Sequence, residues 1–267
     1  MINIANITSR QNRILLSEMV RTDLKQRYQS SALGYVWSLL RPLLLFGTLY
    51  VVFTQFLKFG DDVPNFAVSL LLGIVMWSFF AEATQTSLTS IVERGDLIRK
   101  IQIPRYLIVV ARVVAGLINL GISLAVVLIF MLLSDIDLTF SALLFPLIIL
   151  EFVVLTTGLS FFLSALYVRF RDASYLWEVI IQALFYLTPI LYPLSLIPSE
   201  LARKFLMLNP LAQMVQDARA VLIYDGTTTV YDLFDTFWVV PYVLVAIVVV
   251  VSALYFKKES KTFAENV

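Results

Sequence analysis

The sequence contains neither cysteine nor histidine. Disulfides, thiol nucleophiles, imidazole bases and the usual zinc ligands are therefore excluded. Charged residues are few, at 15% of the chain, and no stretch fits the Gly-x-x-x-x-Gly-Lys-Ser/Thr loop that cradles nucleotide phosphates. These absences leave little material for catalysis, and the sequence offers no such loop with which this chain could bind a nucleotide itself.

Apolar sequence, in contrast, is abundant. Hydrophobic residues make up 60% of the 267 residues, and the mean hydropathy is +0.86, which is too apolar for an ordinary soluble domain. The apolar runs exceed the roughly ten residues of a membrane-barrel strand, and helices satisfy their own backbone hydrogen bonds in lipid. We therefore expect an all-α integral membrane protein. The net charge is only +1, and the charged residues lie between the apolar runs and not on one basic face, so the sequence indicates no nucleic-acid partner.

Six apolar segments are long enough to cross about 30 Å of hydrocarbon. They are residues 39–57, 66–91, 113–133, 140–167, 175–194 and 237–256. A seventh span within residues 206–224 is rejected because Asp217, Arg219 and other polar residues interrupt it. Most Lys and Arg residues flank one side of these spans, and short basic loops stay cytoplasmic. We expect both termini to be cytoplasmic, with an N-terminal segment 1–36, a transmembrane domain 37–256 and a tail 257–267.

The N-terminal segment predicts a surface helix. Residues 1–27 are polar and lack the apolar core and cleavage site of a removable signal peptide, so we expect none. Within residues 6–28, Leu16, Val20, Leu24 and Tyr28 recur every four residues opposite basic side chains. This pattern is typical of an amphipathic helix on the cytoplasmic membrane surface. An ordinary packed helix is the alternative.

Two other segments outside the spans show structural signals. Residues 93–106 surround Leu97 and Ile98 with basic side chains, which fits either a short helix presented to a partner or a loop that only sets topology. Residues 198–224 contain the pair Asn209-Pro210, which favours a turn between two short helices. That segment either dips back into the membrane or forms a peripheral loop, and both interpretations stay open.

Ionisable and aromatic residues within the spans are candidates for a transport path. A charge in hydrocarbon costs at least about 2.5 kcal/mol and usually faces a bundle interior or a wet cavity, which singles out Glu82, Glu151 and Glu178. One face of the fifth span is predicted to carry Glu178, Gln182, Phe185, Pro189 and Tyr192. Similar faces on the first and second spans carry Phe46, Tyr50 and Phe53, and Trp77, Phe80 and Thr84.

Aromatic faces with occasional polar groups suit a glycan, because sugars present both hydroxyls and apolar C–H faces. The same stripes are also typical of lipid-facing or packing residues in membrane helices. Glu82 either contacts the substrate or anchors helix packing and a gate.

Several different short motifs follow one another along nearly the whole chain. They are residues 21–28 (RTDLKQRY), Ser31, residues 33–34 (LG), Trp37, Leu40, residues 42–44 (PLL), residues 77–80 (WSFF) with Glu82, residues 97–100 (LIRK), residues 103–105 (IPR), residues 167–172 (YVRFRD), and residues 209–211 (NPL) with Arg219. Each motif is weak alone, but their order and spacing resemble the ABC-2 type permeases of polysaccharide exporters.

The resemblance implies a homodimeric permease subunit in the cell inner (cytoplasmic) membrane, which exports a lipid-linked polysaccharide such as an O-antigen or a teichoic acid. It implies a separate cytoplasmic ABC ATPase in two copies, which would bind ATP and Mg, while this chain is not an enzyme and holds no cofactor. Residues 93–103 would form a coupling helix on the ATPase. Its contact residues are expected to be Arg94, Asp96, Leu97, Arg99, Lys100 and Ile101. Residues 196–224 would form re-entrant gate helices, which adds Asn209 and Pro210 to the pathway or gate.

Two alternatives remain from the sequence. Related ABC-2 permeases export drugs or small lipids, although the polysaccharide-type motifs and the lack of a large external domain favour glycans. An integral-membrane transferase acting on lipid-linked sugars would need a base such as Glu82, and the absence of histidine and of clustered outer-loop carboxylates counts against it.

Overall fold

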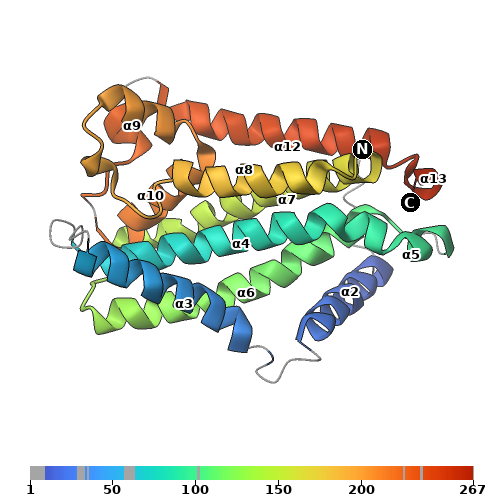
Figure 1. The fold of residues 1–267 in the computed structure, drawn as a ribbon, viewed down its shortest axis with the longest axis horizontal. Coiled ribbons are helices and arrows are strands. Elements are labelled where there is room, and N and C mark those ends of the chain that lie inside the picture. Colours follow the sequence, from blue (N-terminus) through green and yellow to red (C-terminus); the bar gives the residue numbers. More distant parts are fainter. Residues whose placement is uncertain are drawn as a thin grey trace.

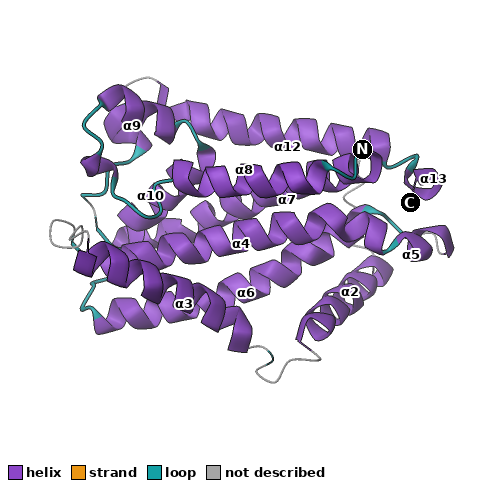
Figure 2. Ribbon diagram, in the orientation of Figure 1, coloured by secondary structure: helices purple, strands orange, loops and turns teal. Residues whose placement is uncertain are grey.

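The computed structural model describes residues 10–28, 34, 36–56, 64–100, 103–224, 226–234 and 237–266, and every regular element within these ranges is helical (Figures 1 and 2). Five helical segments are long and apolar enough to cross a membrane. They are α3 (Val36–Val51) with its π-helical end (Val52–Phe56), α4 (Phe66–Glu93), α6 (Tyr106–Leu133), α7 (Phe145–Arg169) with the preceding 3-10 turn (Phe140–Leu144), and α12 (Val240–Glu259) with its own 3-10 turn (Phe237–Val239). They correspond to five predicted spans, although α6 begins well before Val113.

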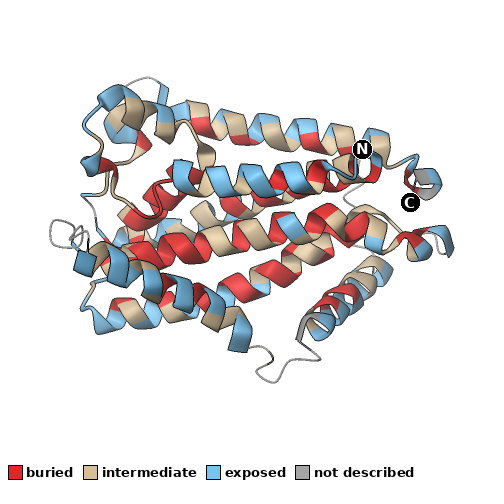
Figure 3. Cartoon of the chain, in the orientation of Figure 1, coloured by how far each residue is buried: buried red, intermediate tan, exposed pale blue. Residues whose placement is uncertain are grey.

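The central helix of the bundle is α4. Both α6 and α7 pack along it, α12 packs along α7, and α3 lies against α4 and α6, with the long helices side by side (Figure 1). In its most apolar stretch 67% of α4 is buried, compared with 11% of α3 (Figure 3). The core therefore lies around α4, and α3 presents an apolar surface to its surroundings.

The fifth predicted span, residues 175–194, is broken. Helix α8 (Ala173–Leu187) has 15 residues and covers about 22 Å, less than the roughly 30 Å of hydrocarbon. Pro189 ends it because proline has no amide hydrogen and its ring collides with the carbonyl four residues earlier. Thr188, which precedes the proline, is already extended (φ −96°, ψ 127°). The prediction that Pro189 and Tyr192 continue the helical face of Glu178 was therefore wrong.

Beyond α8 the chain folds into a compact helical cap, which defines the α10 end of the molecule. It comprises a 3-10 turn (Leu194–Leu196), α9 (Glu200–Met207), α10 (Pro210–Leu222) and α11 (Val230–Leu233). The predicted turn between two short helices is confirmed: Asn209 Oδ1 accepts a hydrogen bond from the Leu211 amide at 3.1 Å, and Pro210 opens the helix. Residues 211–219 are all buried, against α4, α7 and α12, so α10 is not a peripheral loop.

The opposite end, called the α5 end, carries α2 (Arg10–Tyr28), α5 (Gly95–Lys100) and α13 (Phe263–Asn266) (Figure 1). The described part of the predicted amphipathic helix is α2, while residues 6–9 lie outside the described ranges. Met19 and Val20 are buried where α2 packs against α6. One face of α2 therefore packs against the bundle, and the location of this helix on the membrane surface stays a prediction.

Candidate coupling region and transport elements

Helix α5 is the predicted coupling helix. Ile98 is buried and Leu97 half-buried, whereas Asp96, Arg99 and Lys100 are exposed. Ile98 belongs to an apolar cluster that α2, α6, α7 and α12 share at this end. The helix thus presents charged side chains on an apolar anchor, while the sixth predicted contact residue, Ile101, lies outside the described residues.

The C-terminal tail folds back onto this region. Phe263 of α13 is 0% exposed and meets Phe256 edge-on, with ring centroids 5.5 Å apart, and Phe256 in turn packs against Phe161 at 4.8 Å. Helix α13 also contacts α5 and α7. The tail therefore supports α5. The sequence signal that points to this contact is one aromatic residue within a polar tail.

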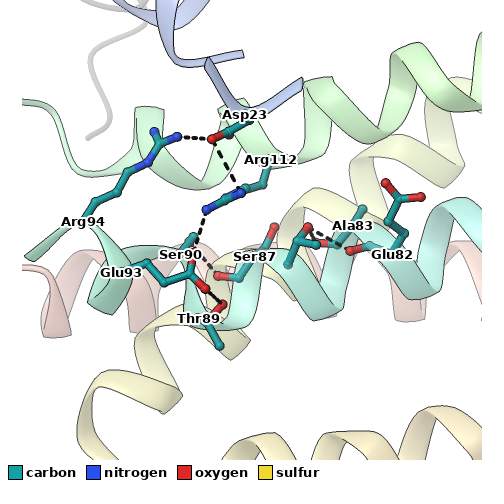
Figure 4. Close-up of polar contacts among 10 residues, drawn as sticks. Asp23, Glu82, Ala83, Ser87, Thr89, Ser90, Glu93, Arg94 and Arg112 are labelled. Carbon is teal, nitrogen blue, oxygen red and sulfur yellow. Dashed lines mark hydrogen bonds and ion pairs between the residues drawn. The ribbon is translucent and has the colours of Figure 1, made fainter. Parts of the chain in front are cut away.

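A buried ion-pair network joins α2 to the end of α4 and to α6 (Figure 4). Arg94 donates a hydrogen bond to Asp23, Arg112 Nη1 lies 3.5 Å from Asp23 Oδ1, and Arg112 Nη2 lies 2.6 Å from Glu93 Oε2. The Asp23 side chain is 1% exposed and each arginine side chain 14%. Burial lowers the pKa of the Arg94 guanidinium, and the Asp23 carboxylate opposes that shift. Arg94, which directly precedes α5, is thereby tied to α2.

The sequence patterns did not identify Asp23 or Arg112 as candidate site residues. The signals were present, because Asp23 follows Met19 and Val20 by four and three residues and so shares their buried helix face. Arg112 lies inside an otherwise apolar helix. A charge on a buried face needs a partner of opposite sign, and each of these residues is the other's partner.

Glu82 and Phe80 contact other helices in the middle of the bundle. Asn119 Nδ2 of α6 donates to Glu82 Oε1 of α4 at 3.1 Å, which agrees with an anchoring role for this half-buried carboxylate. Phe80 is 1% exposed, and its ring lies 5.6 Å from Trp77 and 6.3 Å from Trp177. Phe80 therefore serves helix packing within this chain.

The other predicted pathway residues differ in exposure. Tyr50, Glu178 and Gln182 are exposed; Trp77, Phe185, Tyr192, Asn209 and Pro210 are half-buried; Phe46 is buried. Trp77 and Phe185 stack with ring centroids 5.4 Å apart, which joins α4 to α8. The polar face of α8 is consequently reduced to Glu178 and Gln182, both on the surface of the protomer.

At the α10 end, Arg219 binds three backbone carbonyls. Its Nε donates to Ser69 O at 3.1 Å, Nη1 to Pro189 O at 2.6 Å and Nη2 to Ile190 O at 2.7 Å. Gly73 leaves the necessary space, because a Cβ there would lie 3.0 Å from Arg219 Nη2. The Arg219 guanidinium thus connects α10 both to α4 and to the non-helical segment after α8, an arrangement called the Arg219 clamp below.

Further polar contacts fix α10 in the bundle. Gln213 Nε2 lies 2.7 Å from Asp217 Oδ2 and 3.5 Å from Glu151 Oε2 of α7, and the Tyr242 hydroxyl of α12 donates to Asp217 at 3.1 Å. Asn209 Nδ2 donates to Thr188 Oγ1 at 3.2 Å. Within the described ranges, no group of three His, Cys, Asp or Glu residues is placed to hold a metal ion.

A sequence profile described as ABC-2 type transporter matches residues 15–223. The chain belongs to the ABC-2 type transporter family. The match extends from α2 through α10 and so includes both the ion-pair network and the Arg219 clamp. Membership of the ABC-2 family makes the protein a membrane transport subunit rather than an enzyme.

Curated relatives of this ABC-2 chain carry a common name. An O-antigen export system permease protein RfbA of Klebsiella pneumoniae is 32% identical over 252 residues, 94% of each chain. A second one from the same organism is 30% identical over 252 residues, again 94% of each chain. The RfbA protein of Myxococcus xanthus is 31% identical over 212 residues, 79% of this chain and 81% of that protein. The resemblance predicted from the ordered motifs is confirmed.

Replacing Asp23 with alanine should loosen α2. The change leaves Arg94 and Arg112 buried without their shared carboxylate, and removing one partner of a buried pair costs about 3–5 kcal/mol. The purified variant should melt at a lower temperature, and limited trypsin digestion should cut α2 faster. Glu18→Ala removes an exposed carboxylate from the same helix and serves as the control. Wild-type melting and digestion of Asp23→Ala would refute the structural role of the network.

Replacing Arg219 with lysine should weaken the clamp although the charge is kept. An ammonium group lacks the planar fork that reaches three carbonyls, and each lost bond to a charged group is worth about 1.5–3 kcal/mol. We expect a lower melting temperature and faster amide hydrogen exchange around residues 188–191. Arg169→Lys, at an exposed arginine, is the matched control. Unchanged exchange in Arg219→Lys would show that other contacts hold the break.

Proposed function

We propose that this chain is the permease subunit of an ABC exporter that moves a lipid-linked polysaccharide across the cytoplasmic membrane, driven by a separate ATPase subunit. The observation that carries the proposal is the similarity of 30–32% over most of both chains to proteins named O-antigen export permeases. Export of a drug or small lipid, and a transferase activity, have no comparable support.

In the proposed topology, α8 and the non-helical segment after it form a sixth span, and both termini are cytoplasmic. The basic residues at the α5 end support this orientation, because Arg99, Lys100, Lys257 and Lys258 are all exposed there. Helices α9 and α10 would then re-enter the membrane from the opposite side. The buried polar contacts of α10 to α4, α7 and α12 support a place within the bundle for that helix.

We further infer a homodimer whose two copies enclose the glycan path. The support is the polar pair Glu178 and Gln182, which α8 exposes among apolar side chains. A carboxylate facing lipid is costly, so this face should meet water, substrate or the second copy. Tyr50 and the apolar exposed side of α3 offer a second wall for such a path.

Coupling to the ATPase is assigned to α5. The exposed side chains of Asp96, Arg99 and Lys100 are suited to orient an ATPase subunit, one per permease, which would bind ATP and Mg. Because Ile98 and Arg94 anchor both ends of this short helix, a displacement of α5 is transmitted to α2 and α6. Movement of the permease requires that the contacts between α5 and the ATPase differ between the two nucleotide states of the ATPase.

Deleting the gene for this chain should abolish surface display of the cell's exported glycan, which should accumulate inside. Plasmid-borne wild-type chain should restore display, and affinity purification of that chain should recover an ABC ATPase. Immunoblots of intact cells for the glycan and mass spectrometry of the purified complex provide the measurements. Normal display in the deletion strain, or transport by the chain without an ATPase, would refute the proposed function.

The double variant Arg99→Glu, Lys100→Glu should uncouple ATP hydrolysis from export. Reversing two exposed charges on α5 disturbs docking without touching the buried Ile98 anchor, so membrane insertion should stay normal. Surface glycan should fall at least tenfold, with ATPase activity no longer raised by the permease. Arg10→Glu, Arg13→Glu makes the same charge change on the exposed side of α2 and is the control. Full export by the α5 variant would remove this face from the coupling role.

A further inference from the structure

We propose that a cavity at the α10 end binds a single neutral sugar ring, a proposal that rests on the glycan export proposed above. The cavity has a volume of about 250 Å³ and is lined by residues that precede and begin α4, by the segment after α8, by the second half of α10, and by residues 224 and 226–228. It adjoins the Arg219 clamp. It is therefore a feature of the protomer itself, separate from the exposed face of α8.

A buried amide without a partner lies in the wall of this cavity. Gln216 is 2% exposed, lines the cavity, and makes no hydrogen bond to another residue in the described part of the chain. Its neighbours on α10 differ, because Gln213 is bonded to Asp217 and Arg219 to three carbonyls. An amide in a cavity wall is satisfied when a water or a ligand in the cavity bonds to its donor and its acceptor.

The polar groups around Gln216 define the class of ligand. An amide offers a donor and an acceptor side by side, which matches neighbouring hydroxyls on a sugar, and Ser69, Ser195 and Thr228 add further hydroxyls. Arg219 already directs Nε, Nη1 and Nη2 at backbone carbonyls. The lining thus favours a neutral ligand over an ion, and an apolar ligand would leave Gln216 unpaired.

The size and the aromatic wall favour one ring. Pockets for drug-sized ligands measure about 300–1,000 Å³, so this cavity suits a monosaccharide unit better than an oligosaccharide. Tyr192 and Tyr224 supply faces for sugar C–H groups. The Tyr224 ring lies against Gly226, where a Cβ would come within 2.3 Å of it. Only glycine leaves room for the ring in that position.

The test uses the full-length protein in lipid nanodiscs and saturation-transfer NMR. The probes are the methyl α-pyranosides of glucose, galactose and mannose, with sodium pyrophosphate as the charged alternative. We expect at least one glycoside to bind the wild type and to raise its melting temperature, whereas pyrophosphate should do neither at this site. Gln216→Leu should weaken glycoside binding at least tenfold.

Stability measurements separate lost binding from misfolding. Leucine fills a similar volume without a buried amide, so ligand-free Gln216→Leu should melt at or above the wild-type temperature, and the glycoside should no longer raise it. Thr228→Val is a second variant that removes a cavity hydroxyl and should also weaken binding. Thr157→Val, which changes a half-buried threonine of α7 outside the cavity, should bind like the wild type.

Three outcomes would overturn the proposal: no glycoside binds the wild type, the cavity variants bind as tightly as the wild type, or pyrophosphate competes for the site. If no glycoside binds the wild type, water alone forms the hydrogen bonds of the Gln216 side chain. The complemented deletion strain distinguishes the two proposals. If it restores surface glycan although no glycoside binds the cavity, the export function stands and the sugar site is refuted. Normal display without the chain would instead remove the proposed function.

Discussion

Inside a membrane bundle, every backbone carbonyl outside a regular helix needs a donor from elsewhere in the protein. Pro189 creates this problem by ending α8, and Arg219 solves it with direct hydrogen bonds to Pro189 O and Ile190 O. Its third bond, to Ser69 O, reaches α4. Because these bonds start from α10, one guanidinium fixes where α8 stops, how deeply α10 is buried and how both meet the central helix. Gly73 is part of the same arrangement, since a side chain there would occupy the space of the guanidinium.

The central helix links this clamp to the coupling region. Helix α4 has 28 residues and is therefore about 42 Å long, with Ser69 in its first turn and Glu93 at its end. At that end, Glu93 and Arg94 join the ion-pair network with α2 and α6, and α5 follows directly. The ion-pair network and the Arg219 clamp thus contact opposite ends of the same buried helix, α4. In the proposed coupling, a displacement of α5 would reach the α10 end through α4 or through the helices packed along it.

Apolar length and motif order predicted the helical fold, the five of six expected spans that form membrane-length helices, a short helix within residues 93–103 and the turn at Asn209. These features depend on local signals, namely hydropathy, proline and capping chemistry. The partners of Asp23, Arg112 and Arg219 depend on which helix faces meet in space, which hydropathy does not encode. The fifth span shows the limit most clearly: steps of three and four residues aligned Glu178 with Tyr192, but the proline between them ended the helix. Likewise, an aromatic stripe did not distinguish the buried Phe80 from the exposed Tyr50.

The ion pairs at the α5 end are better understood as a positioning device than as a source of stability. Replacing both partners of a buried pair with well-packed apolar residues is often neutral or stabilising, whereas removing Asp23 alone leaves two arginines without their shared carboxylate. Apolar contacts tolerate small rotations and slides, whereas hydrogen bonds to a charged group fix direction and distance. Arg94 therefore sets the register between α2 and α5, and Phe263 closes the other side of α5. A helix of six residues has little stability of its own, so these contacts hold α5 in place against its neighbours.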